Sequence, residues 1–110
     1  MEITPRASDL MPHALLLLKE AGHELRKGEI ESAMRAKVLE MHYSYRAPAL
    51  TFALTYLKRQ GLLDNPRHGV WGTTEQGRLA QMTLPQAREI ERRLEREYLN
   101  KKQKQQKREG

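Results

Sequence analysis

The chain has 110 residues, which suits one domain with a single core and is too short for a two-domain enzyme with a cleft between its halves. Lysine and arginine number 20 against 14 acidic residues, so the net charge of +6 favours polyanionic partners such as nucleic acid. Cysteine is absent, which excludes disulfides and thiolate chemistry, and no apolar run approaches the roughly 20 residues of a membrane span. We therefore expect a cytoplasmic protein with no membrane segment.

The first two predicted helices cover residues 9–21 and 29–41. Ser8 or Asp9 is expected to cap the first helix, and Gly22 to follow its end. Both carry apolar residues at helical spacing: Leu10, Ala14, Leu17, Leu18 and Ala21 in the first, and Ile30, Ala33, Met34 and Val38 in the second. Residues 23–28 form a connection with one or two extended positions.

A third helix is predicted from Pro48, which suits a first helical turn, to Gly61, which suits a helix end. Its inward face is expected to consist of Leu50, Ala53, Leu54 and Leu57. At about 100° per residue, the outward positions are then Thr51, Phe52, Thr55 and Arg59, with Tyr56 on the flank.

After Gly61 the pattern predicts a hairpin, with strands at residues 62–63 and 70–73. The turn is built from Asp64, Asn65, Pro66 and Gly69. Trp71, the single tryptophan, is expected on the second strand, where either Trp71 or its neighbour Val70 faces the core. A short helix toward Met82 then begins, capped by Thr73 or Thr74.

The last predicted helix covers residues 85–100, and its apolar stripe consists of Ala87, Ile90, Leu94 and Tyr98. The stripe suits either packing on the first helix or a homodimer seam. Residues 101–110 are basic, have nothing to bury and are expected to be disordered.

Residues 50–78 carry a set of motifs: "YLKRQGLL" at 56–63, "RHGVW" at 67–71 and "TEQG" at 74–77. In this order they resemble the winged-helix domain at the N-terminus of Mrr-type restriction endonucleases. The resemblance implies a mainly α fold with a small β-hairpin, a winged helix-turn-helix over residues 1–84. Phe52 stands where the family often has tryptophan, and Arg46 lies upstream of the family's arginine, so base contacts are not carried over. The nuclease motif of that family does not occur in these residues.

The resulting hypothesis is double-stranded DNA binding, as the recognition module of a Mrr-like defence system or as a small transcription regulator. Between residues 41 and 74 the only acid is Asp64, which favours phosphate contacts there. The candidate DNA-binding residues are Arg46, Thr51, Phe52, Thr55, Tyr56, Lys58, Arg59, Arg67 and His68. Alternatively, helix packing covers Phe52 and Tyr56, and the hairpin tip is merely solvated.

No catalytic pattern is recognisable, because the four histidines are scattered and lie at no characteristic spacing from a serine or an acid. The sequence therefore indicates a protein that is not an enzyme, with no metal, cofactor or small-molecule substrate. The rival hypothesis is a protein-interaction or dimerisation module on the same scaffold. An apolar face with few cations is expected in that case.

Overall fold

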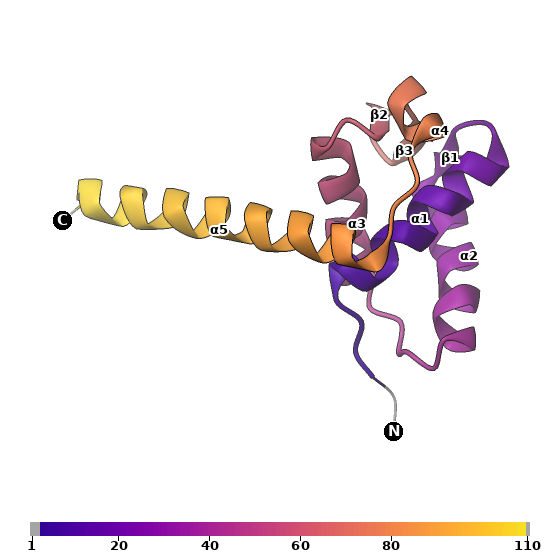
Figure 1. The fold of residues 1–110 in the computed structure, drawn as a ribbon, viewed down its shortest axis with the longest axis horizontal. Coiled ribbons are helices and arrows are strands. Elements are labelled where there is room, and N and C mark those ends of the chain that lie inside the picture. The colour runs from indigo at the N-terminus through magenta and orange to yellow at the C-terminus, as the bar shows by residue number, and fades with distance from the viewer. Residues whose placement is uncertain (1–2, 110) are drawn as a thin grey trace.

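The computed structural model describes residues 3–109, with side chains as far as Lys102. This part of the chain is mainly helical, with a small antiparallel sheet and a long C-terminal helix (Figure 1). The elements, in chain order, are α1 (Ala7–Ala21), β1 (Leu25–Arg26), α2 (Lys27–Glu40), α3 (Ala47–Arg59), β2 (Leu63–Arg67), β3 (Val70–Thr73), α4 (Glu75–Leu79) and α5 (Leu84–Glu109).

Helix α1 is the central element, because it packs against α2, α3 and α5. Its buried stripe contains Leu10, Ala14 and Leu18, as predicted. The helix begins two residues earlier than expected, so neither Ser8 nor Asp9 is its N-cap; that position belongs to Arg6. Asp9 still serves the helix start, since its carboxylate accepts a hydrogen bond from the Arg6 N–H at 2.8 Å.

Helices α2 and α3 contribute the rest of the helical core. From α2 the buried residues are Ile30, Met34 and Val38, whereas Ala33, predicted on the same stripe, is exposed. The four residues predicted to face inward from α3 are all fully buried: Leu50, Ala53, Leu54 and Leu57. The helix ends at Arg59, and Gly61 follows with φ of 78°, a left-handed conformation that glycine adopts without strain.

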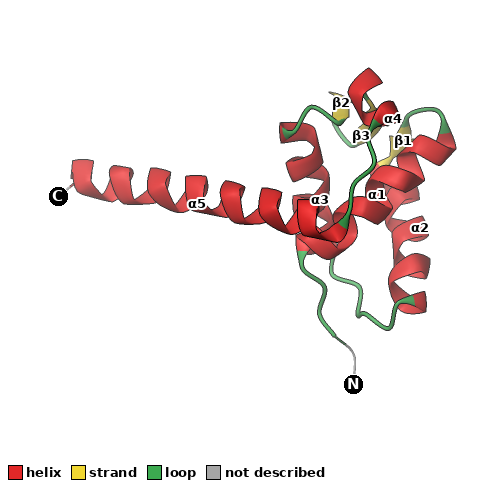
Figure 2. Cartoon of the chain, viewed as in Figure 1, coloured by secondary structure: helices red, strands yellow, loops and turns green. Residues whose placement is uncertain are grey.

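The sheet has the strand order β1-β3-β2 and is antiparallel throughout, and Figure 2 shows it at one end of the helical body beside α4. Strand β2 is longer than predicted, because it continues through the expected turn residues with a register shift between Asp64 and Arg67. The Asn65 amide donates to the carbonyl oxygens of Arg67 and Val70 and so holds this irregular stretch against β3. The tip is reduced to His68 and Gly69.

The "TEQG" motif has a structural explanation. The Thr74 hydroxyl accepts a hydrogen bond from the Gly77 N–H at 3.0 Å and donates to the Gly61 carbonyl at 2.6 Å, so Thr74 is the cap of α4 and Thr73 is not. A Cβ at Gly77 would lie 1.9 Å from the Leu62 carbonyl oxygen, so only glycine fits there. The motif fastens α4 to the end of α3.

Helix α5 continues to Glu109, well past its expected end at Asn100, and it projects away from the body (Figure 1). The expectation of disorder is therefore wrong for residues 101–109, while Gly110 lies outside the described residues. The physical reason is composition: lysine, glutamine, arginine and glutamate are good helix formers, and no glycine or proline interrupts them. Ala87 and Leu94 are buried, whereas Tyr98 is 65% exposed.

Candidate nucleic-acid interface

The outward face of α3 is divided between two neighbours. Thr51 and Lys58 are exposed on the side of α2 and the hairpin, where the Lys27 Nζ lies 2.7 Å from the Thr51 hydroxyl oxygen. Phe52 and Tyr56 lie on the side of α5 and line a groove with it, to which Thr55 and Arg59 also contribute. On a helical wheel the two pairs are about 100° to 160° apart. The predicted contact residues thus belong to two different surfaces.

Lys27 connects the hairpin to α3 and was not among the residues singled out from the sequence. Its ammonium group donates to the Thr51 hydroxyl, and its backbone N–H donates to the Gly69 carbonyl oxygen at 2.7 Å. The start of α2, the hairpin tip and the exposed edge of α3 therefore form one surface. No local pattern could have revealed this, because the contact depends on the pairing of β1 with β3.

The two threonines of α3 are held by hydrogen bonds from their hydroxyls to the backbone, and the Thr51 hydroxyl also accepts from Lys27. The Thr51 hydroxyl donates to the Ala47 carbonyl at 3.1 Å, and the Thr55 hydroxyl donates to the Thr51 carbonyl at 2.9 Å. A hydroxyl has two lone pairs, so the Thr51 hydroxyl, which accepts from Lys27 with one of them, retains the other for an incoming donor. These bonds hold both side chains in fixed rotamers. The hydroxyl groups therefore have fixed positions on the surface of α3.

The cations of this region are exposed, but two of them are paired with acids from distant segments. Arg59 lies 3.4 Å from Glu97 of α5, and Arg67 lies 3.2 Å from Glu24. The surface is therefore less acid-poor than residues 41–74 suggest. Exposed ion pairs of this kind contribute about 0–1 kcal/mol to the stability of a protein. A phosphate group can therefore replace the carboxylate with little loss of free energy. Arg46, Lys58 and His68 are exposed as well.

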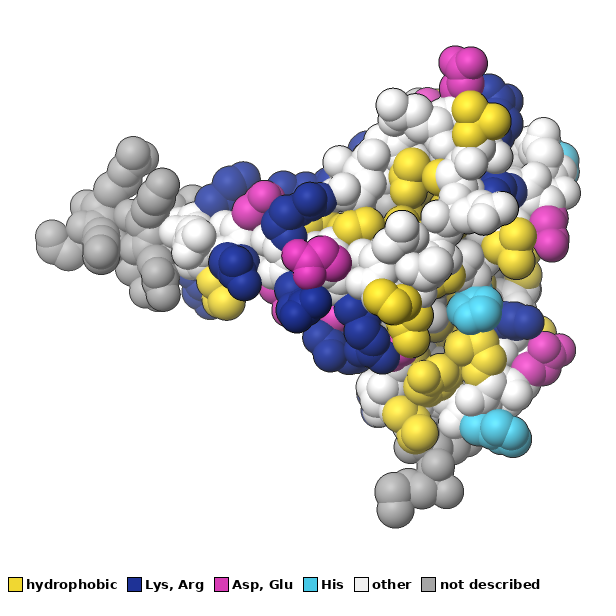
Figure 3. All heavy atoms as spheres, in the orientation of Figure 1, with side chains coloured by type: hydrophobic (Ala, Val, Ile, Leu, Met, Phe, Trp, Pro, Cys, Tyr) yellow, Lys and Arg dark blue, Asp and Glu magenta, His cyan; other side chains and the backbone are white. Residues whose placement is uncertain are grey.

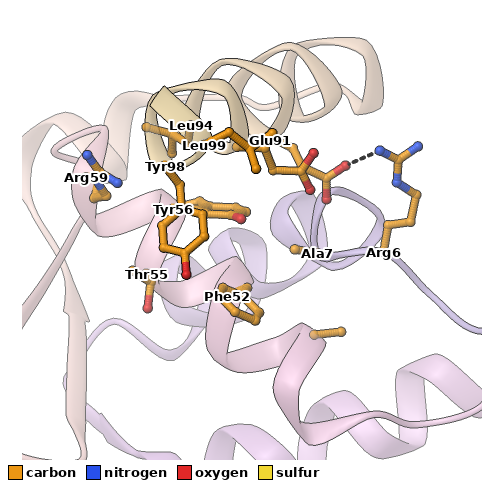
Figure 4. Close-up of a pocket in the computed structure, with 12 residues that line it drawn as sticks. Arg6, Ala7, Phe52, Thr55, Tyr56, Arg59, Glu91, Leu94, Tyr98 and Leu99 are labelled. Atoms are coloured by element: carbon orange, nitrogen blue, oxygen red, sulfur yellow. Dashed lines mark ion pairs between the residues drawn. The ribbon is translucent and has the colours of Figure 1, made fainter. Parts of the chain in front are cut away.

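The groove between α3 and α5 is mainly apolar and has a volume of about 640 Å³. In Figure 4, the rings of Phe52 and Tyr56 on α3 lie opposite Tyr98 on α5. The Phe52 and Tyr56 ring centroids are 6.0 Å apart, with Phe52 54% exposed. Burial raises the pKa of the Tyr56 phenol, and the negative charges of Glu95 and Glu91 raise it further, so the phenol stays neutral at physiological pH.

A buried carboxylate fixes the position of α5 and hence the shape of this groove. Glu91 accepts hydrogen bonds from the Ser8 N–H at 3.0 Å and the Ser8 hydroxyl at 3.1 Å, and it pairs with Arg6 at 2.7 Å. One turn away, Arg88 pairs with Asp9 at 3.1 Å. Glu91 thus satisfies donors at the start of α1 from a position 83 residues away. Sequence spacing offers no signal for it.

Two further observations concern the described residues as a whole. Among the side chains that the structure describes, residues 3–102, no three histidine, cysteine, aspartate or glutamate groups gather so that they could hold a metal ion. None of the helices in this range combines the length and the apolar character needed to cross a bilayer.

The predicted contact residues thus lie on two surfaces. The first, called the cationic edge, is formed by α3, Lys27 and the hairpin. The second is the apolar groove between α3 and α5. Neither the family models nor the curated proteins nor the solved structures with which the chain was compared give a match, so these two surfaces are the basis for assigning a function.

Proposed function

We propose that the chain is a double-stranded DNA-binding module of the winged helix-turn-helix type. The order of its elements supports this proposal, because a helix, a short strand, two helices and a hairpin follow one another and the short strand pairs with the hairpin. In such modules the second helix of the helix-turn-helix lies in the major groove. Here that helix is α3, and the hairpin is the wing.

The observation that carries the proposal is the joint surface centred on Lys27. Lys27 links the hairpin tip to the start of α3 through Gly69 and Thr51, and the side chains of Thr51, Lys58, Arg67 and His68 are exposed. Threonine methyl groups and hydroxyls suit base edges, and the cations suit phosphates on either side. Arg46, at the start of α3, and Arg59, near its end, add charge along the same helix.

The resemblance to the N-terminal domain of Mrr-type enzymes suggests a role in defence against foreign or modified DNA. A small transcription regulator has the same requirement for duplex recognition. Both roles depend on the surface described above, so one binding experiment tests the common part.

We expect the affinity for a DNA duplex to fall steeply with salt concentration. Four to six phosphates neutralised per chain correspond to a log-log slope of about −4 to −5, from about −0.9 per phosphate. Fluorescence anisotropy of a labelled duplex across a salt series measures this slope. A flat profile, or no binding at about 50 mM salt, contradicts the proposal and favours a protein-docking module.

A matched pair of variants locates the surface. Lys27→Ala is expected to weaken duplex binding several-fold, because it removes a cation and the link between hairpin and α3. Lys37→Ala removes the same charge from the other end of α2, where the lysine pairs with Glu40, and is expected to have little effect. Equal losses for both variants would indicate attraction by net charge alone.

A further inference from the structure

Three large apolar side chains are exposed at the groove between α3 and α5. Phe52 from α3 and Tyr98 and Leu99 from α5 are 54%, 65% and 56% exposed, and all three line it. Beyond Leu99 the helix has no apolar residue. Its distal half projects from the body (Figure 1).

The charged residues on the groove side of α5 change sign along the helix. Glu91, Glu95, Tyr98 and Lys102 follow one another at spacings of four, three and four, so they lie on one face. Glu91 is buried against Ser8, so the exposed charges on this face are Glu95 before Tyr98 and Lys102 after it. Glu95 and Lys102 are two helical turns apart, about 10.5 Å, too far to pair within one helix.

This pattern is complementary to itself in the antiparallel orientation. If two copies of α5 run antiparallel with a two-fold axis between positions 98 and 99, Glu95 lies opposite the partner's Lys102, and Tyr98 lies opposite the partner's Leu99. The same contacts recur on the other side of the axis, as a two-fold interface requires. A parallel pair would instead place glutamate against glutamate and lysine against lysine.

We propose that two copies of the chain associate through antiparallel pairing of their α5 helices around Tyr98 and Leu99. The partner's Leu99 then covers Tyr98, and the two Glu95–Lys102 pairs lie on either side of this apolar contact. Along the visible side of α5, basic and acidic side chains alternate and apolar ones appear where the helix meets the body (Figure 3). This proposal is independent of DNA binding.

The dimer leaves the Lys27 side of α3 uncovered, whereas Thr55 and Arg59 lie on the groove side. Thr51 and Lys58 lie on the side of α3 that faces Lys27, away from α5. Each dimer therefore presents two copies of that edge, which is the arrangement that a DNA site with two-fold symmetry requires.

Charge reversal tests the register directly. Sedimentation equilibrium of the full chain over a range of concentrations is expected to show a monomer–dimer equilibrium. Glu95→Lys and Lys102→Glu each turn two attractions into two repulsions, so each is expected to raise the dimer Kd about tenfold or more. The double variant Glu95→Lys/Lys102→Glu restores opposite charges across the axis and is expected to recover the parent Kd.

Glu89→Lys is the matched control, because it makes the same change of charge on a different face of α5, where Glu89 pairs with Arg92. It is expected to leave the Kd unchanged. Since Glu95 and Lys102 are exposed, the variants should fold, and circular dichroism checks this. A parent chain that stays monomeric at all concentrations overturns the proposal and leaves the groove to a different protein. Equal effects of Glu89→Lys and Glu95→Lys, or a double variant that remains monomeric, overturn the antiparallel register.

Discussion

Trp71 is a core residue that also forms part of the sheet. Its side chain is only 9% exposed, it pairs with Leu25 across β1 and β3, and it belongs to the same buried cluster as Leu63. Of the two neighbours on β3, Trp71 is therefore the one that faces inward, while Val70 is only half-buried. A tryptophan at the base of the hairpin ties the strands to the helices.

Trp71→Ala is expected to lower the free energy of unfolding by about 2–4 kcal/mol, the usual range when a large buried side chain is truncated. Urea denaturation followed by circular dichroism measures the change, with Trp71→Phe as a milder control. In the parent protein, tryptophan emission should be blue-shifted and nearly unaffected by duplex DNA. Red-shifted emission that DNA quenches, together with an alanine variant of parental stability, would place the ring on the DNA side.

Glu91 is the second residue on which the fold depends. It is 2% exposed and accepts two hydrogen bonds from Ser8, whose side chain is fully buried. Glu91→Ala leaves these donors without an acceptor, so a loss of about 2–4 kcal/mol in the free energy of unfolding is expected. Glu91→Gln, which keeps an acceptor but loses the charge, is expected to fall between that variant and the parent.

The control for Glu91 is Glu89→Ala, because Glu89 is exposed and pairs only with a neighbour on its own helix. Its effect on the unfolding free energy should stay within about 0.5 kcal/mol. Equal stability of Glu91→Ala and Glu89→Ala in urea denaturation would mean that Glu91 does not anchor α5 to α1.

At the scale of elements, we propose that the hairpin and the end of α3 contact the phosphates of the DNA backbone. The double variant Lys58→Ala/Arg67→Ala is therefore expected to weaken binding to all duplexes about equally. The salt slope should fall by about one for each lost phosphate contact. Anisotropy titrations with two unrelated duplexes measure both quantities. A changed sequence preference with an unchanged slope would show instead that these residues read bases.

The elements themselves were largely predictable, because their signals are local. The buried stripe of α3 follows from spacing alone, and Gly22 and Gly61 follow the helix ends as expected. The structure differs from the predicted elements where a side chain or a neighbouring strand outweighs the local preference for a turn or a helix end. Asn65 keeps β2 against β3 through residues that otherwise favour a turn, and the uninterrupted helix formers after Asn100 extend α5.

At the scale of the whole molecule, the distribution of acidic residues around the arginines differs from their distribution along the sequence. The sequence places a single acid between residues 41 and 74, yet folding brings Glu24 to Arg67 and Glu97 to Arg59. Both pairs join segments far apart in the sequence. A count of charges by segment therefore overstates how freely these arginines are available.

The sequence by itself determined the helical class, the position of the hairpin and the inward face of α3, because periodicity and turn chemistry act within a few residues. Only the tertiary structure decided that Lys27 joins the hairpin to α3, that Glu91 anchors α5 to α1, and that Phe52 and Tyr56 line a groove with α5. These contacts depend on how elements pack across long separations, and no local pattern specifies that packing. The split of the α3 surface into a cationic edge and an apolar groove is thus a property of the fold.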